Sequence, residues 1–396
     1  MEVLALTLAL IILLGLIASQ FFSKIGFPGL FGLLLLGIMI GPSGLNLISG
    51  SFLNLSEDIR VIALIIILLR AGLGLHREAI RKVGSHALKM SFIPCVIEGV
   101  AIIFISQQLL GLSFLEAGML GFILAASSPA IIVTHMLSFI TQKKGTAKGI
   151  PTLILAGSSV DDVVSITLFS VFLGAYTGAN IDLTYQILGI PLSLILGAAG
   201  GFIIGIGLLK LFHYWKINAT EKIFLILAAA ILFKSLGDLL KGTVPVAGLL
   251  GVMIIGFVLV DREPNLGYKL SQKFARIWLL AEIILFVLVG AQVDLSLSLQ
   301  AGWLGLIIII GGLLARSCGV YLSLLGSKLN LKEKVFCMVS YTPKATVQAA
   351  IGPLPLAAGV LSGELILAIS VLAILITAPL GAAAIKFTGE RFLSSD

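Results

Sequence analysis

The sequence predicts an all-α protein that crosses a membrane about thirteen times, and three observations lead to this prediction. Of 396 residues, 59% are hydrophobic and only 11% are charged, less than half of the roughly 25% found in soluble domains. Apolar runs of about 20 residues, long enough to cross a bilayer, recur from end to end. Short clusters of Lys and Arg separate these runs, as in the loops of membrane proteins. A large soluble protein is excluded, because no soluble core needs so many such runs.

The boundaries of the spans follow from the apolar runs. They are 1–20, 28–48, 59–75, 87–110, 115–137, 150–174, 184–210, 222–237, 243–260, 277–293, 301–325, 333–351 and 364–386. The first run has an acidic rather than a basic flank, so it is interpreted as a retained span and not a signal peptide. Because the loops are short, we expect a single transmembrane unit over residues 1–396.

The basic residues predict the orientation of the chain. One set of alternating loops carries twenty Lys and Arg residues, and the other set carries only Arg60 and Lys241. Loops rich in Lys and Arg stay in the cytoplasm, so the N-terminus is expected outside and the C-terminus in the cytoplasm. The net charge of +7 belongs to this topology signal. The expected partner of the surface is therefore membrane lipid, and no nucleic-acid partner is expected.

Two pairs of motifs indicate an internal repeat. RAGLGLH (70–76) and VGAQVDL (289–295) are glycine-rich span ends, whereas SSPA (127–130) and YTPKA (341–345) place a proline among polar residues within an apolar run. The members of each pair lie seven spans apart. Because seven is odd, the two copies point opposite ways through the membrane, which is typical of secondary transporters with interrupted helices.

This pattern predicts the repeat boundaries and the positions of the breaks. The two inverted repeats are expected at 28–210 and 222–386. The residues expected at the two breaks are Ser128, Pro129, Tyr341, Thr342 and Pro343. A broken helix exposes half-helix ends near the membrane midplane, where a cation can be held without its full water shell.

Few charged residues lie within the spans, and each costs about 2.5–3.5 kcal/mol at a helix centre unless it is paired or faces water. Arg316 is always ionised, so it needs a carboxylate, either Glu98 or Asp161. Lys344 either neutralises the carbonyl end of the broken helix or takes part in transport. Glu282 either lies in the span or turns toward the cytoplasmic loop.

Asp161 and Asp162 lie near the middle of the sixth span. Adjacent helical residues diverge by about 100°, so we expect one carboxylate to face a water-filled cavity and the other a cationic partner. Ser158 and Ser159, one turn earlier, offer further oxygen ligands for a hard monovalent cation. The arrangement favours competition between a proton and a cation. The alternative is that the pair only neutralises Arg316 or Lys344.

Four segments together resemble a known family: LRAGLGL (69–75), SSPAIIV (127–133), GSSVDDVVSI (157–166) and LKEKVFCMVSYTPKATVQAAIGP (331–353). They look like the monovalent cation:proton antiporter superfamily, in particular its sodium/hydrogen exchanger B-like branch with its bacterial sodium/proton antiporters. The resemblance covers residues 28 to 386.

The resemblance implies a homodimer, core helices at about 87–174 and 301–386, and elevator-type alternating access. It also implies that the two partly unwound helices, the fifth and twelfth spans, cross at their breaks, with Pro129 at the crossing. Carried over by motif, Asp162 is the principal carboxylate for Na⁺ and H⁺, and Asp161 is its neighbour, often asparagine in electroneutral relatives. Arg316 stands where many members with two aspartates carry lysine. With Glu98 and Lys344 it is expected to form a polar network.

These observations predict a sodium/proton antiporter rather than an enzyme. It would exchange cytoplasmic Na⁺ (or Li⁺) for external H⁺, and it would need no cofactor. Two alternatives stay open at this point. One is the same fold transporting K⁺ or an organic anion, and the other is an ion sensor that transports nothing.

Overall fold

A computed structural model describes residues 4–25, 29–75, 77–177, 183–215, 217–240, 246–291 and 295–395. The side chains of residues 54, 57, 77–80, 82, 159, 183–190 and 295–301 lie outside this description, as do Lys241 and residues 292–294 of the second glycine-rich stretch. The described chain is helical: α1 (Leu4–Lys24), α2 (Gly29–Ile40), α3 (Gly50–Asn54), α4 (Ser56–Leu73), α5 (Arg77–Leu110), α6 (Phe114–Leu124), α7 (Pro129–Thr141), α8 (Ile150–Tyr176), α9 (Leu183–Tyr214), α10 (Ala219–Leu239), α11 (Gly248–Arg262), α12 (Pro264–Ala291), α13 (Leu295–Ser323), α14 (Leu331–Ser340), α15 (Thr346–Ile351), α16 (Leu354–Ala357) and α17 (Gly363–Phe392).

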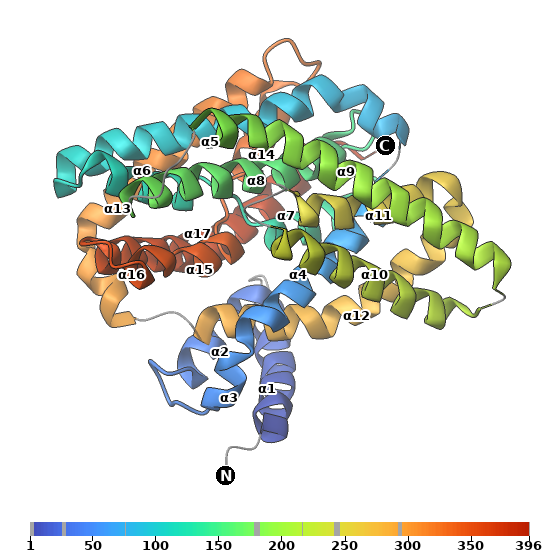
Figure 1. Cartoon of the computed structure of the whole chain (residues 1–396), viewed down its shortest axis with the longest axis horizontal. Helices are drawn as coiled ribbons and strands as arrows, with labels where there is room; N and C mark the ends of the chain where they lie inside the picture. Colours follow the sequence, from blue (N-terminus) through green and yellow to red (C-terminus); the bar gives the residue numbers. More distant parts are fainter. Residues whose placement is uncertain are drawn as a thin grey trace.

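The helices pack in two groups (Figure 1). In the first, α5 lies along α8 and α13, α6 packs on α5 and α8, and α17 packs on α13 and α14. In the second, α4 packs on α11 and α12, α2 on α12, and α9 on α11. The packing repeats between helices seven spans apart. The pair α5–α8 corresponds to α13–α17, and the pair α6–α8 corresponds to α14–α17. The repeat boundaries at 28–210 and 222–386 stay a prediction.

The predicted spans coincide with helices of the structure. Within the described residues, eight segments are long and apolar enough to cross a membrane. They are α1, 83–110 of α5, the interrupted pair α6–α7, α8, 191–214 of α9, α12, 302–323 of α13, and α17. The other predicted spans correspond to α2, α4, α10, α11 and the pair α14–α15, which are shorter or carry more charge. The protein is therefore a multi-pass integral membrane protein, while the number of thirteen stays a prediction.

Two helices are interrupted where the sequence places a proline among polar residues. Between α6 and α7 the chain leaves the helix at residues 125–128, and Pro129 begins α7 with no backbone N–H to satisfy. Between α14 and α15 the chain is non-helical at residues 341–345. The backbone N–H of Ser128 donates to the carbonyl of Pro343 at 2.8 Å. The two breaks therefore meet, as the family resemblance implies.

The glycine-rich span ends serve close helix packing. A Cβ at Gly72 of α4 would lie 1.9 Å from the carbonyl oxygen of Met253 on α11, and one at Gly290 of α12 would lie 2.2 Å from the carbonyl of Leu34 on α2. Only glycine permits such an approach of two backbones. Gly72 and Gly290 thus hold the second group of helices together, whereas Gly74 of the first motif packs against Leu137 of α7.

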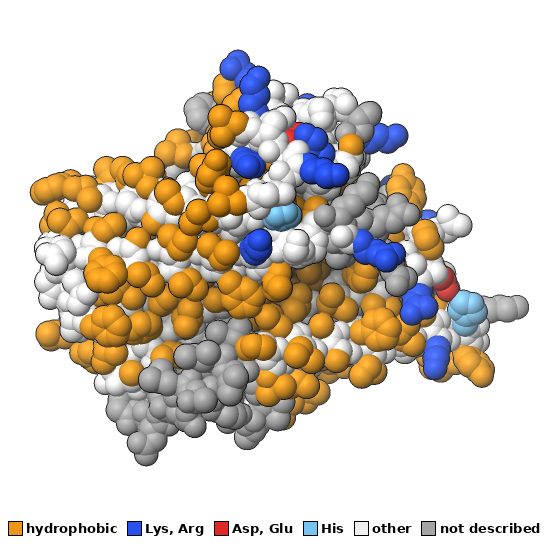
Figure 2. Space-filling model, turned by 90° about the horizontal axis from the view of Figure 1, so that it is seen from above, with side chains coloured by type: hydrophobic (Ala, Val, Ile, Leu, Met, Phe, Trp, Pro, Cys, Tyr) orange, Lys and Arg blue, Asp and Glu red, His pale blue; other side chains and the backbone are white. Residues whose placement is uncertain are grey.

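The surface has the character of a lipid-facing protein. Figure 2 shows hydrophobic side chains over most of the visible face, with Lys and Arg gathered in its upper and right parts. Exposed large apolar residues line several helices, among them Leu13 of α1, Phe104 of α5 and Leu232 of α10. In water such a surface would drive aggregation, so this face fits a hydrocarbon environment.

Candidate functional site

Arg316 of α13 is the centre of the candidate site. The side chain is only 1% exposed and forms ion pairs with Glu98 of α5 at 2.7 Å and with Asp161 of α8 at 2.6 Å. These are the two carboxylates that the sequence offered as alternatives, and Arg316 contacts both. A guanidinium group carries five N–H donors in a planar fork, so it can bind two acids and still reach other acceptors.

The remaining donors of Arg316 satisfy the ends of the two broken helices. Nε donates to the carbonyl of Tyr341 at 2.6 Å, and Nη1 donates to the carbonyl of Ala125. Ala125 and Tyr341 follow the last residues of α6 and α14, where carbonyl groups have no partner within the helix. One cation therefore neutralises the negative ends of both half-helices.

Lys344 lies in the second break and is paired with Glu98. Its Nζ is 2.7 Å from Oε1 of Glu98, although the two atoms do not have hydrogen-bond geometry. The sequence left two roles open for Lys344: neutralising the carbonyl end of the broken helix, or taking part in transport. In the structure it is Arg316 that contacts the helix-end carbonyls, and Lys344 neutralises a carboxylate. The backbone N–H of Lys344 donates to Thr377 of α17 at 2.9 Å.

The two aspartates differ in their partners. Oδ2 of Asp161 accepts from Arg316 and, at 3.2 Å, from the backbone N–H of Ser127. Asp162 is 7% exposed, makes no ion pair within the described residues, and its Oδ1 has no hydrogen-bond partner there. With every acid and base ionised, Glu98 and Asp161 balance Arg316 and Lys344, so Asp162 carries the one uncompensated charge of the group.

Gln348 of α15 is a site residue that the sequence reasoning missed. Its side-chain amide nitrogen donates to the carbonyls of Ile123 and Ala126 at 3.0 and 2.9 Å. Both carbonyls belong to the end of α6, where the break removes their helical donors. The available signal was a single amide residue in an apolar run directly after the YTPKA break. Since a buried amide needs partners, it could have been expected to serve the other break.

Several buried oxygen atoms around the breaks lack partners among the described residues. They are Oγ of Ser127 and Ser128, Oδ1 of Asp161 and Asp162, the Tyr341 hydroxyl, Oγ1 of Thr346 and Oε1 of Gln348. Ser158 is fully buried and its hydroxyl reaches the carbonyl of Leu155 at only 3.4 Å. The hydroxyl of Thr342 instead donates to the carbonyl of Val339 in the last turn of α14. Buried polar atoms are normally satisfied, so this oxygen-rich region suits a dehydrated cation or water.

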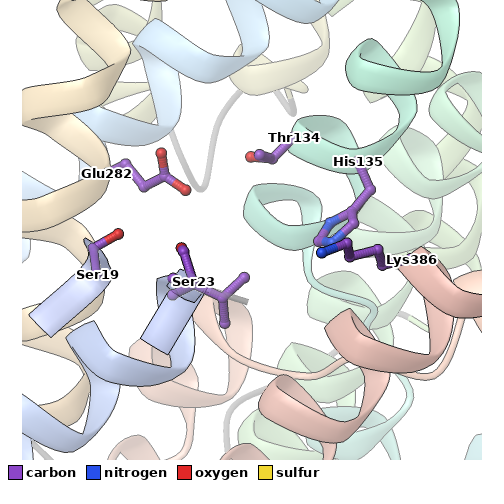
Figure 3. Close-up of a pocket in the computed structure, with 8 residues that line it drawn as sticks. Ser19, Ser23, Thr134, His135, Glu282 and Lys386 are labelled. Carbon is purple, nitrogen blue, oxygen red and sulfur yellow. The ribbon is translucent and has the colours of Figure 1, made fainter. Parts of the chain in front are cut away.

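A cavity of about 300 Å³ lies beside the broken helix α7. In Figure 3, Glu282 of α12 faces Thr134 and His135 of α7 across this cavity, with Lys386 of α17 beside His135 and with Ser19 and Ser23 of α1 below. Glu282 therefore lines a cavity within the protein, one of the two options that the sequence left open. Thr134 lies five residues, or about 7.5 Å along the helix, from the break at Pro129.

Comparison with known proteins identifies the family. The family model described as "Sodium/hydrogen exchanger, transmembrane" matches residues 8–390. The chain belongs to the sodium/hydrogen exchanger family. Among its relatives, sodium/hydrogen exchanger 9B2 of Xenopus tropicalis is 36% identical over 85% of this chain, and the human 9B2 protein is 32% identical over 92%. The chain spans 64% of the Xenopus protein and 70% of the human one.

A solved structure shows the same fold. The sodium proton antiporter MjNhaP1 of Methanocaldococcus jannaschii superposes with a TM-score of 0.79 over 97% of each chain, at 23% sequence identity. Membership of the superfamily that the motifs resemble is confirmed, and so is the sodium/proton antiporter fold with two broken helices that meet.

Proposed function

We propose that this protein is a sodium/proton antiporter in which Asp162 binds Na⁺ (or Li⁺) and H⁺ in turn. The observation that carries the proposal is the unequal pairing of the two aspartates. Asp161 is held by Arg316, whereas Asp162 is buried and forms no ion pair with any base in the part of the chain that the structure describes. A buried carboxylate without a counter-charge is costly, so it must take up a proton or a cation. The relatives named as sodium/hydrogen exchangers support this function.

The charge count around Asp162 supports an exchange that moves no net charge. Two bases balance the other two acids, and Lys344 is engaged by Glu98. One H⁺ or one Na⁺ on Asp162 then gives a site of the same net charge. If only the loaded site crosses the membrane, one Na⁺ is exchanged for one H⁺, and the rate does not depend on voltage. A transported net charge would instead couple to about 2.3 kcal/mol per 100 mV.

Alternating access by an elevator-type movement is part of the proposal. The cavity beside α7 has one wall from α7 and α17 and another from α1 and α12. Because α7 packs on α8 and α1 packs on α2 and α12, the two walls belong to the two packing groups. A displacement of one group against the other would open or close it. Lys24 ends α1 directly after Ser23 of the cavity lining, and Lys386 of α17 lines the cavity itself. Since both lysines belong to the basic set of loops, we assign the cavity to the cytoplasmic side. The N-terminus then lies outside, and α1 offers its apolar face to lipid or to a second copy.

The alternative substrates differ in how well they match the negative charge of the Asp162 carboxylate. An organic anion would meet an uncompensated carboxylate and be repelled, so the site disfavours it. Potassium takes the same oxygen ligands and is tested by competition. A sensor that transports nothing would bind Na⁺ but show no flux.

The decisive experiment measures proton flux in proteoliposomes driven by a Na⁺ gradient. Asp162→Asn should abolish the flux, whereas Asp58→Asn, an exposed acid on the predicted outer side, should leave it unchanged. Retained flux in Asp162→Asn would overturn the assignment. Repeating the wild-type assay with and without a membrane potential tests the charge count, and a series of Na⁺, Li⁺ and K⁺ determines the cation.

A further inference from the structure

The hydroxyl of Tyr341 is an unused polar group at the centre of the site. Tyr341 is fully buried, and its hydroxyl has no hydrogen-bond partner among the described residues. The rest of the residue is fixed: its carbonyl accepts from Arg316, and its ring lies 5.2 Å from the Arg316 guanidinium carbon. Such a ring–guanidinium contact is favourable on its own. The hydroxyl therefore adds no hydrogen bond to the contacts that fix this side chain among the described residues.

Gly157 of α8 makes room for this hydroxyl. A Cβ at Gly157 would lie 2.2 Å from the Tyr341 oxygen, closer than any real Cβ contact, while Met90 and Ala87 crowd the same position at 3.1 and 3.5 Å. Any other residue at position 157 would push the hydroxyl away. The phenol oxygen thus lies against the backbone of the helix that carries both aspartates.

The register of α8 places Asp161 next to this contact. Residues four apart lie on the same face of a helix, so Asp161 stands one turn beyond Gly157 on the face that Tyr341 touches. Helical Cβ atoms tilt toward the N-terminus, so the Asp161 carboxyl leans back toward Gly157. Its Oδ1 is buried without a partner, as is Oδ1 of Asp162. Three buried unpartnered oxygens thus belong to one turn of α8 and the phenol packed on it.

We propose that the Tyr341 hydroxyl is a neutral oxygen ligand of the transported cation, a role that rests on the proposed function. A dehydrated monovalent cation needs several oxygen ligands, and neutral ones complete its shell without adding charge. A proton bound to Asp162 needs no such ligand. The hydroxyl therefore contributes to cation binding and leaves proton binding unchanged, which separates its effect from that of the carboxylates.

The test is Tyr341→Phe, because a structural role and a ligand role predict different results. Removing a buried hydroxyl that has no partner should leave the melting temperature without Na⁺ unchanged or raise it. As a ligand, its loss should raise the KM for Na⁺ about three- to tenfold. It should also reduce the melting-temperature increase that Na⁺ produces. When wild type and variant are compared at the same ratio of [Na⁺] to KM, the pH midpoint of the flux should not move.

Tyr176→Phe is the matched control, since its hydroxyl accepts from the Leu361 backbone at the other end of α8. This control should keep the wild-type KM. An unchanged KM and an unchanged Na⁺ stabilisation in Tyr341→Phe would overturn the proposal. So would a shifted pH midpoint with an unchanged KM, because the hydroxyl would then serve proton binding.

A second variant tests the same ligand in case Tyr341→Phe fails to fold. Gly157→Ala should displace the hydroxyl and raise the KM for Na⁺ although Tyr341 is retained. The double variant Gly157→Ala/Tyr341→Phe should resemble either single variant, because both remove one ligand, whereas additive increases in KM would contradict the proposal. The Na⁺-induced melting shift reports binding even if wild-type flux is absent. Failure of the transport function is thus distinguished from failure of the ligand assignment.

Discussion

Asp161→Asn and Asp162→Asn should have opposite effects on stability, although both remove one buried charge. Asp161 accepts two hydrogen bonds, one of them from the guanidinium of Arg316 at 2.6 Å. A hydrogen bond to a charged group contributes about 1.5–3 kcal/mol, and breaking a buried ion pair costs about 3–5 kcal/mol. Because Arg316 keeps its ion pair with Glu98, we expect Asp161→Asn to lower the free energy of unfolding by about 2–3 kcal/mol, no more than the lower limit for a broken buried ion pair.

Asp162→Asn should leave the free energy of unfolding unchanged or raise it. Asp162 makes no ion pair among the described residues, and its removal relieves repulsion from the neighbouring Asp161 carboxylate. The measurement is thermal unfolding of the purified variants in detergent without Na⁺, with Asp58→Asn as an exposed control. Each kcal/mol shifts the melting temperature by about 2–4 °C in domains of 150–250 residues, so Asp161→Asn should melt several degrees lower.

The comparison refutes the reasoning if Asp162→Asn is destabilised as much as Asp161→Asn. Equal losses would mean that Arg316 serves both carboxylates alike, and Asp162 would then have no uncompensated charge to offer an ion. Flux measured on the same preparations separates stability from transport. Asp162→Asn should be stable and inactive.

Three further substitutions test the helix breaks and the glycine contacts. Gln348→Leu leaves two buried carbonyls at the end of α6 without donors, at about 1–3 kcal/mol each, and should lower the melting temperature. Gln348→Glu should lower it at least as much, because an ionised carboxylate has no donor for these carbonyls. Arg316→Lys keeps the charge but lacks the planar fork that reaches two acids and two carbonyls; we expect it to fold less stably, and a wild-type melting curve would contradict the geometry. Gly72→Ala should reduce the yield of monodisperse protein because its Cβ would meet the Met253 carbonyl at 1.9 Å, whereas Gly84→Ala, with nothing within 4 Å, should not.

The fold was largely predictable because hydrocarbon imposes a simple pattern on sequence. Apolar runs predicted the helices, and prolines among polar residues predicted both breaks, since proline removes a backbone donor and disfavours helix at the residue before it. That the two breaks touch, through Ser128 and Pro343, was expected from the family resemblance. Periodicity alone gives no contact between residues more than 200 positions apart.

The buried charges that lie together could be named from the sequence, but their pairing could not. The cost of a buried charge required a carboxylate for Arg316, but it could not decide between Glu98 and Asp161, which both bind it. For Lys344 it left two roles open, neutralising the carbonyl end of the broken helix or taking part in transport. The role of Gln348 was not predicted because its acceptors are backbone carbonyls. Every residue carries such a carbonyl, so no pattern of side chains indicates which ones need a donor. The contact of Tyr341 with Gly157 depends likewise on packing between distant helices.

The backbone bond between Ser128 and Pro343 has a consequence for how this chain can change length. An extra residue in either interrupted segment would add up to about 3.3–3.6 Å of chain and displace the half-helix that follows, pulling the bond apart together with the carbonyls that Arg316 holds. Insertions and deletions should therefore be rejected at both crossings, even though neither segment is regular helix. The turns that join the helices at the surface, such as that before Ala219, should accept added residues freely. Irregular backbone in this protein is thus of two kinds, one fixed in length and one free to vary.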